Sequence, residues 1–354
     1  MKSLIFLSTE PYSGKTGLAL NLAQEFDSRG QKVGFLKPVG NTPDRTDSTV
    51  TEKDAVFAKE VLALDDPLDR ICPVVLTSRE TNDRLRQVEG DGARDRVKEA
   101  FKEISEGKDI VVMEGSGHIN DGRLYGVSGV DLAQSLNSRA IVVIKLDNPY
   151  EIVDDVLVLS DRLGENLGGV IFNWVQKNKM PVIKELIMPF LEKKGIPSFG
   201  AIPREESLVA VSVEDLSKAL GGRILCAERN KGVMIETFMV GAMGQEQAIR
   251  YFRRKARKAV ITGGDRSDFQ LAALETQTGC LILTGNYPPP STVLAVAESK
   301  GVPVILVDVD TLTAVEKTES MIGQVGIDSA DKLSEMRRYM QEYIDIDRLC
   351  KVAA

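Results

Sequence analysis

The stretch that decides the fold is Ser8–Thr16, which reads Ser-Thr-Glu-Pro-Tyr-Ser-Gly-Lys-Thr. It follows an apolar run at Leu4–Leu7 and precedes apolar residues, from Leu18 to Phe26, whose spacing places them on one helix face. A strand, a loop, Gly-Lys-Thr and a helix stand in the order that a phosphate-binding loop requires. In such a loop, backbone N–H groups and the helix N-terminus bind an anion, the lysine neutralises phosphates and the hydroxyl can hold Mg²⁺. The alternative is an ordinary glycine-containing turn with a solvated lysine.

The composition indicates a protein of two globular domains. The chain has 354 residues, and 43% of them are hydrophobic. A single hydrophobic core rarely supports a chain of this length. The net charge is −7 and there is no long basic run, which argues against a nucleic-acid partner or an anionic membrane surface. Since the sequence shows neither a signal peptide nor a run of about 20 apolar residues, we expect a cytoplasmic location.

Strand-like and helix-like segments alternate along the chain, which predicts two α/β domains. Residues 1–205 are expected to form a mainly parallel sheet with helices on both faces. Its strands are predicted at 2–7, 32–37, 110–113, 140–145, 168–172 and, as the last edge strand, 198–202. Its helices are predicted at 15–29, 54–64, 84–104, 150–163 and 181–194, with a loop at 41–53. Residues 206–354 are expected to form a second, smaller α/β domain, closed by an amphipathic helix at 330–344.

Four polar residues stand at strand or helix ends where this fold class gathers ligands. Lys37 would bind an acidic substrate or a terminal phosphate, unless it is a solvated strand-end lysine. Asp54 either opens a helix or supplies a carboxylate for Mg²⁺. Glu114 ends an apolar strand before Gly-Ser-Gly, as the metal-side carboxylate of phosphate-loop proteins does. Asn173 can pair with a nucleotide base edge, and Trp174 beside it packs on that base or belongs to the core.

In the second domain, the segment Thr262–Arg266 reads Thr-Gly-Gly-Asp-Arg. Its two glycines stand between a predicted strand and a predicted helix, where they can expose backbone N–H groups to an anion, with Arg266 as a second contact. Thr284 and Gly285 are expected at the neighbouring strand end. The alternative is a tight turn in which Asp265 caps the helix and pairs with Arg266.

These motifs resemble two known domain types. The first two hundred residues resemble a dethiobiotin-synthetase-type domain of the phosphate-loop superfamily, through Ser8–Thr16, Lys37-Pro38-Val39, Asp54, Glu114-Gly115-Ser116-Gly117 and Asn173. The second half resembles the small α/β domain named for an Asp-Arg-Thr-Gly-Gly motif, through Val240–Met243, Ile261–Asp268 and Leu283–Gly285. The order of the two domains is similar to that of the N-terminal region of long-form phosphotransacetylases.

The first resemblance implies ATP and Mg²⁺ as cofactors and an acidic group near Lys37. It implies nucleotide binding by Ser13, Gly14, Lys15, Thr16, Gly17 and Asn173, metal binding by Thr16, Asp54 and Glu114, and catalytic roles for Lys15 and Lys37. The loop departs from the family pattern because Ser8 replaces a glycine, Pro11 a threonine and Tyr12 a polar residue. Nucleotide binding tolerates these changes better than recognition of the dethiobiotin precursor does.

Three functions are compatible with these residues. The first is a regulatory or sensor protein that couples nucleotide state to the second domain in acyl-phosphate metabolism. The second is an ATP-dependent ligase that acts on a carboxylate or carbamate held near Lys37, and the third is an interaction module with an inactive phosphate loop. If the chain is an enzyme, we expect at most a slow ATPase or a ligase. Phosphate acetyltransferase activity is not expected, since no transferase domain follows. We expect a nucleotide and a small acidic ligand as partners, and a homo-oligomer.

Overall fold

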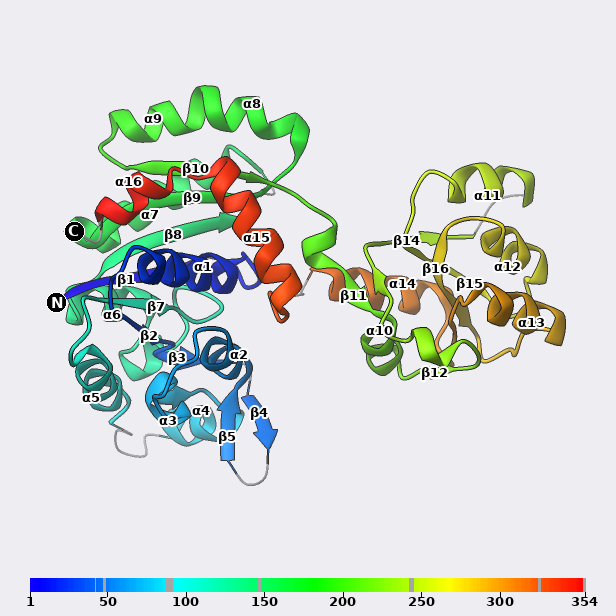
Figure 1. Cartoon of the computed structure of the whole chain (residues 1–354), viewed down its shortest axis with the longest axis horizontal. Coiled ribbons are helices and arrows are strands. Elements are labelled where there is room, and N and C mark those ends of the chain that lie inside the picture. The colour runs from blue at the N-terminus through cyan, green and yellow to red at the C-terminus, as the bar shows by residue number, and fades with distance from the viewer. Residues whose placement is uncertain are drawn as a thin grey trace. The chain divides into compact units, whose positions relative to one another are not determined.

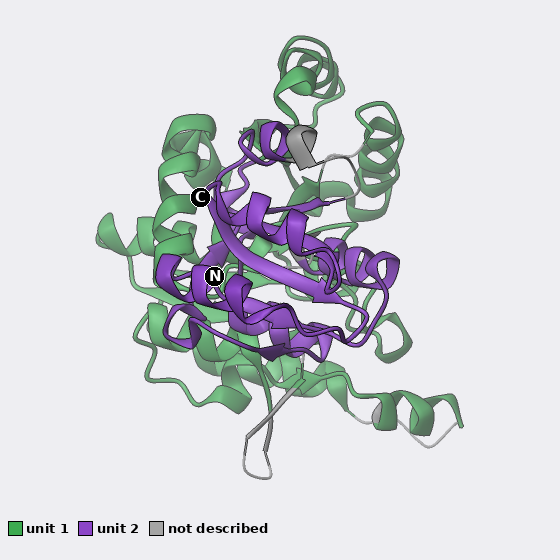
Figure 2. Cartoon of the chain, turned by 90° about the vertical axis from the view of Figure 1, so that its right-hand side faces the viewer, with its two compact units in different colours: residues 1–204, 326–354 green, residues 205–325 purple. Residues whose placement is uncertain are grey.

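The computed structural model describes residues 1–41, 43–46, 49–86, 92–145, 148–241, 245–323 and 326–352. The chain divides into two compact units, which are coloured separately in Figure 2. Unit 1 comprises residues 1–204 and 326–354, and unit 2 comprises residues 205–325. Both are built on mainly parallel sheets with helices, so the predicted α/β fold class is confirmed.

Unit 1 contains a parallel six-stranded sheet with the strand order β10-β9-β8-β1-β7-β2 (Figure 1). The strands are β1 Lys2–Leu7, β2 Val33–Leu36, β7 Ile110–Glu114, β8 Arg139–Lys145, β9 Leu167–Val175 and β10 Ser198–Pro203. All six predicted strands are present, and the predicted last strand lies at an edge. Because β1 lies between β7 and β8, the loop after it meets the carboxyl ends of both neighbours.

The central strand β1 is buried on both faces because its residues are almost all apolar. Ile5 and Leu7 point to one face and pack in a core cluster with residues of the helices α5 Ala93–Ser105, α6 Gly129–Ser135 and α7 Glu151–Leu163. Leu4 and Phe6 point to the other face, which α1 Lys15–Ser28 covers, and are equally buried. Because helices cover both faces, the carboxyl ends of the strands are where a fold of this class binds ligands.

The segment between β2 and β7 differs from the prediction. Residues 41–53 were expected to form a loop, but β4 Pro43–Thr46 and β5 Thr49–Glu52 pair there as an antiparallel hairpin, and α2 Lys53–Val61 follows directly. The predicted helix at 84–104 is shorter, since α5 begins at Ala93, and residues 87–91 lie outside the described residues. The remaining elements here are β3 Val39–Gly40, α3 Leu68–Ile71, β6 Val74–Val75 and α4 Ser78–Leu85.

The predicted helix at 181–194 contains a π-helical turn. It consists of α8 Met180–Val182, the π turn Ile183–Ile187 and α9 Met188–Lys193, which run on without a break. Leu191, Ile183 and Ile187 are buried along it, so the segment still presents one apolar face to the sheet.

The last helices of the chain belong to unit 1, whereas the predicted second domain of residues 206–354 included them. They are α15 Ala330–Tyr343 and α16 Ile346–Val352, and α15 packs on α1 and β10 (Figure 1). Ile344 forms an antiparallel bridge with Gly200 of β10. An amphipathic sequence shows that a helix buries one face, but it does not show which core receives that face.

Unit 2 contains a five-stranded sheet in the order β12-β17-β16-β15-β14. Its strands are β12 Arg223–Ile224, β14 Thr237–Val240, β15 Lys258–Gly263, β16 Thr278–Thr284 and β17 Val304–Leu306, and all pairs except β12 with β17 are parallel. The helices are α10 Val213–Leu220, α11 Gln245–Phe252, α12 Ser267–Leu274, α13 Ser291–Lys300 and α14 Thr311–Gly323. β11 Val211–Ser212 and β13 Met234–Ile235 form a separate pair. None of the helices in the described part of the chain is long and apolar enough to cross a bilayer.

Candidate functional site

The predicted phosphate loop lies between the end of β1 and the start of α1. Gly14 is the N-cap of α1 and has a left-handed φ of 91°. A Cβ atom at Gly14 would lie 2.4 Å from Asn173 Nδ2, so both the backbone conformation and the space require glycine. The amide of Asn173 also donates a hydrogen bond to the carbonyl of Ser13 over 2.8 Å. The end of β9 is thereby joined directly to the loop.

Lys15 reaches across the loop rather than into solvent. Its Nζ donates a hydrogen bond to the carbonyl of Gly117 over 2.9 Å and lies 3.4 Å from Ser13 Oγ. Only 5% of the residue is exposed. Burial lowers the pKa of Lys15 to about 8, against the raising effect of the nearby Glu114 carboxylate. A bound anion would supply negative charge beside the Lys15 ammonium group, which Glu114 compensates only in part.

Lys37, Asp54, Glu114 and Thr16, which the sequence places far apart, meet at one point. Thr16 Oγ1 donates to Glu114 Oε1 over 2.7 Å, and Lys37 Nζ donates to the same oxygen over 3.1 Å. Lys37 also forms an ion pair with Asp54. The parallel strands bring these residues together because Lys37 directly follows β2 and Glu114 ends β7, its neighbour in the sheet.

Glu52 joins this group but is not among the residues predicted from the sequence. Its Oε1 lies 3.6 Å from Lys37 Nζ, and its Oε2 accepts a hydrogen bond from the N–H of Ala55 over 3.0 Å. Glu52 is therefore the N-cap of α2 and is only 1% exposed. The sequence offers one indication of this role, because Glu52 is an acidic residue two positions before Asp54. It lies in the segment 41–53, for which the sequence predicts a loop.

Carboxyl groups outnumber ammonium groups in this cluster, since Glu52, Asp54 and Glu114 surround the single Lys37. Burial raises the pKa of Glu52 to about 7 and also raises the pKa of Glu114. Burial alone would lower the pKa of Lys37, but the carboxylates of Glu114, Asp54 and Glu52 outweigh it and raise that pKa, so the lysine stays charged. Among the described residues, Glu52 Oε1 and Glu114 Oε2 are buried and accept no hydrogen bond. These oxygens are suited to an additional cation.

Asn173 and Trp174 lie near the carboxyl end of β9. Trp174 has a left-handed φ of 62°, which is uncommon for a bulky residue, and its N–H donates to Asn173 Oδ1 over 2.9 Å. Lys145 Nζ lies 4.6 Å and the Arg204 guanidinium carbon 4.9 Å from the centre of the indole ring. The indole is half-buried between strand ends rather than enclosed in the core.

The Thr262–Arg266 turn of unit 2 is built for tight packing. The N–H of Gly264 donates to the Thr284 carbonyl over 3.1 Å, so this donor is already used within the fold. A Cβ at Gly264 would lie 1.9 Å from the Tyr287 carbonyl oxygen. Arg266 is the N-cap of α12 and pairs with Asp268 at 3.6 Å. The turn thus resembles the structural alternative, except that Asp265 neither caps the helix nor pairs with Arg266.

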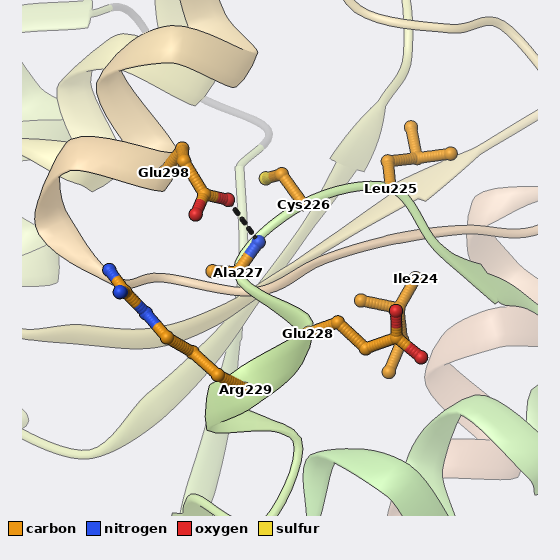
Figure 3. Close-up of a pocket in the computed structure, with 7 residues that line it drawn as sticks. All are labelled: Ile224, Leu225, Cys226, Ala227, Glu228, Arg229 and Glu298. Carbon is orange, nitrogen blue, oxygen red and sulfur yellow. Dashed lines mark hydrogen bonds between the residues drawn. The ribbon is translucent and has the colours of Figure 1, made fainter.

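Unit 2 also contains a pocket of about 340 Å³ beside β12 and α13 (Figure 3). Glu298 of α13 accepts a hydrogen bond from the N–H of Ala227, whose φ is 52°. Cys226, Glu228 and Arg229 supply the other polar side chains of its lining. Burial raises the pKa of the Cys226 thiol, so it is not a reactive thiolate.

Comparison with known families assigns both units. The model described as an AAA domain matches residues 2–212, and the model described as a DRTGG domain matches residues 215–321. The chain is 24% identical to the phosphate acetyltransferase of Deinococcus radiodurans over 367 residues, which are 98% of this chain and 50% of that protein. It is 23% identical to that of Nitrosomonas europaea over 368 residues, 99% of this chain and 52% of that protein. The chain spans about half the length of these relatives, and the predicted resemblance is confirmed.

Two solved structures are similar to part of this chain. Cobyrinic acid a,c-diamide synthase from Mycobacterium smegmatis, with bound ADP and magnesium, has a TM-score of 0.37 and 11% identity, covering 58% of this chain and 88% of that one. The MinD cell division protein of Aquifex aeolicus has a TM-score of 0.37 and 17% identity, covering 59% and 85%. Since the AAA-domain match covers more than half of the sequence, this chain belongs to the AAA-domain family and carries a DRTGG domain at residues 215–321.

Proposed function

We propose that unit 1 binds ATP or a related nucleotide with Mg²⁺, and that the chain is a regulatory protein linked to acyl-phosphate metabolism. The observation that carries the nucleotide proposal is the convergence of separate elements on one loop. Lys15 and Thr16 open α1 beside the carboxylate of Glu114, and Asn173 is hydrogen-bonded to the loop backbone. A helix N-terminus that follows a strand and a loop favours phosphate binding.

The residues present fit a magnesium ion. Thr16, Asp54 and Glu114 supply hard oxygen donors, and buried Glu114 Oε2 accepts no hydrogen bond within the described chain. No three His, Cys, Asp or Glu side chains in the described ranges are arranged to hold a metal by themselves. Mg²⁺ does not need such a set, because it is commonly held by one or two carboxylates together with phosphates and water. When bound, it would neutralise phosphate charge that Lys15 alone offsets only in part.

Two observations support the regulatory role. The relatives that the chain matches are phosphate acetyltransferases, which connects it to acyl-phosphate chemistry, and a DRTGG domain follows the nucleotide unit. The second candidate is an ATP-dependent ligase, which the burial of Lys37 beside the loop favours. We rank the ligase below the regulatory role because Lys37 already pairs with Asp54 and Glu114 and would have to leave them to hold an acidic substrate.

Thermal denaturation of the full-length chain tests nucleotide binding. Mg²⁺-ATP at roughly 100 times its dissociation constant should stabilise the protein by about 2.7 kcal/mol, and Lys15→Ala should remove most of that gain. A turnover assay separates the two candidate roles. Slow ATP hydrolysis that small acids do not change supports the regulatory role. Hydrolysis that rises sharply with one carboxylic acid, and is lost in Lys37→Ala, supports the ligase instead.

A further inference from the structure

The segment after unit 2 returns to the nucleotide unit and packs on the helix that follows the phosphate loop. Residues 326–352 belong to unit 1, and α15 crosses α1 and packs against it (Figure 1). The AAA-domain match ends at residue 212 and the DRTGG match at residue 321, so neither includes this segment. Its position beside the loop nevertheless gives it access to the proposed site.

The segment lies close to Gly17, in the first turn of α1. A Cβ atom at Gly17 would lie 2.9 Å from Ile327 Cγ1 and 3.1 Å from Met336 Cγ. These distances are shorter than ordinary van der Waals contact, so the segment fits against the helix only because residue 17 has no side chain. Ile327 and Met336 therefore fill the space that a side chain at residue 17 would take.

Met336 extends from Gly17 to the loop glycine itself. A Cβ atom added at Gly14 would lie 3.6 Å from Met336 Cε and 2.4 Å from Asn173 Nδ2. Met336 is 1% exposed. Its thioether and the Asn173 amide thus flank the left-handed residue from which the helix N-terminus begins.

A buried hydrogen bond between α1 and α15 fixes the position of α15 along the axis of α1. Asn21, one turn after Gly17, donates through Nδ2 to the carbonyls of Gly17 at 2.9 Å and Leu333 at 3.1 Å. Asn21 is 2% exposed, so a shift of α15 would leave one of the two N–H donors of its amide without a partner in a buried environment. The bond sets the register in which Met336 meets the loop.

Further contacts hold the terminal segment on unit 1. Arg348 forms a two-pronged ion pair with Glu192 of α9, at 2.7 and 2.8 Å. The N–H of Asp345 donates to the carbonyl of Phe199 over 2.8 Å. The segment is thus attached at β10 and α9 as well as at α1, and it is a fixed part of the unit.

We propose that α15 is part of the nucleotide site and that Met336 is a positioning residue, which holds Gly14 and the Asn173 amide where the nucleotide meets them. This inference rests on the proposed nucleotide binding in unit 1. Met336 acts through its neighbours: without its side chain, Gly14 loses packing on one side and Asn173 gains room to turn. The expected ligand is a nucleotide whose phosphates lie at the loop and whose base lies toward Asn173.

The two chain segments that connect unit 1 to unit 2 each carry a residue that lies near the proposed site in unit 1. Before unit 2, Arg204 lies against the indole of Trp174, next to Asn173. After it, Ile327 packs at Gly17.

The test compares three variants of the full-length chain, Met336→Ala, Met336→Leu and Met340→Ala. Met340 lies one turn further along α15, is 2% exposed, and is not among the atoms nearest Gly14 or Gly17. Nucleotide affinity is measured by titration of Mg²⁺-ATP against the fluorescence of Trp174, the only tryptophan, which adjoins Asn173. Melting temperatures are measured in parallel.

We expect Met336→Ala to weaken nucleotide binding by about fivefold or more and to alter the fluorescence of the free protein. Met336→Leu should restore the affinity, because it refills the volume. Met340→Ala should lower the melting temperature similarly but leave the affinity within about twofold of wild type. Wild-type affinity in Met336→Ala, or equal weakening in Met340→Ala, would overturn the inference alone. A wild-type protein that binds no nucleotide would overturn the proposed function together with it.

Discussion

The ammonium of Lys37 donates a hydrogen bond to Glu114 Oε1 over 3.1 Å, and each of these residues is only 2% exposed. The same oxygen accepts a hydrogen bond from the hydroxyl of Thr16. Glu114 is thus shared between the lysine that the sequence predicts to be catalytic and the hydroxyl that it predicts to hold a metal. Lys37 and a divalent cation would both neutralise this group of carboxylates, so removal of the lysine should make the protein depend more on the cation.

Lys37→Gln should destabilise the protein and make its stability depend on Mg²⁺. Removing the ammonium leaves Glu52, Asp54 and Glu114 without their shared cation, and breaking a buried ion pair on one side costs about 3–5 kcal/mol. Saturating MgCl₂ should recover more stability in the variant than in the wild type, since the ion can take the place of the lysine. Chemical denaturation with and without the salt measures both effects.

NaCl of equal ionic strength is the control for that measurement, and Lys98→Gln is the matched variant, since Lys98 is exposed on α5. Equal stabilisation of the wild type and Lys37→Gln by MgCl₂ would show that the ion does not bind at these carboxylates.

Nucleotide binding should take up a proton at alkaline pH. The pKa of Lys15 is lowered to about 8, so at about pH 9 most of the free protein carries a neutral lysine, whereas at about pH 6.5 nearly all of it is charged. Bound phosphate favours the charged form and raises this pKa again. Binding at about pH 9 therefore adds a proton, and binding at about pH 6.5 does not.

Calorimetry of Mg²⁺-ATP binding in two buffers of different ionisation enthalpy detects this uptake. The apparent enthalpies should differ between the buffers at about pH 9. Lys15→Arg keeps the charge at every pH and should abolish the difference. If the wild type gives buffer-independent enthalpies at alkaline pH, Lys15 is not the group that meets the phosphates.

Gly264→Ala should destabilise unit 2, whereas Gly232→Ala should not. A Cβ at Gly264 would lie 1.9 Å from a backbone carbonyl, which cannot move as a flexible side chain does. We expect a loss of about 2–4 kcal/mol, in the range of mutations that force strain on a packed backbone. At Gly232 nothing lies within 4 Å of the added Cβ. Denaturation of both variants measures the difference, and equal stability would mean that the turn opens easily and can receive a ligand.

The sequence predicts those parts of the site that lie at the ends of regular elements. The Gly14-Lys15-Thr16 loop, Lys37 and Glu114 follow buried apolar strands, and the carboxyl ends of parallel strands must meet at one edge of the sheet. Asn173 is found for the same reason. Glu52 is missed because the hairpin that carries it is polar and contains Pro43, so neither strand shows apolar alternation.

The terminal helix shows a second limit of the sequence. The spacing of apolar residues correctly predicts a helix near residues 330–344. Its partner is decided by contacts such as that of Met336 with Gly17, which lie more than three hundred residues apart in the chain. Periodicity shows that a face is buried but carries no information about such a distant partner.

Isothermal titration of Mg²⁺-ATP into the full-length chain tests the central claim most directly, with Lys15→Ala and Lys98→Ala measured beside the wild type. Saturable binding near one nucleotide per chain is expected for the wild type and for Lys98→Ala. Lys15→Ala should bind at least tenfold more weakly, a loss of about 1.4 kcal/mol, because the variant lacks the lysine charge that offsets the phosphates. No heat of binding at millimolar nucleotide, or equal affinity in wild type and Lys15→Ala, would contradict nucleotide binding at this loop.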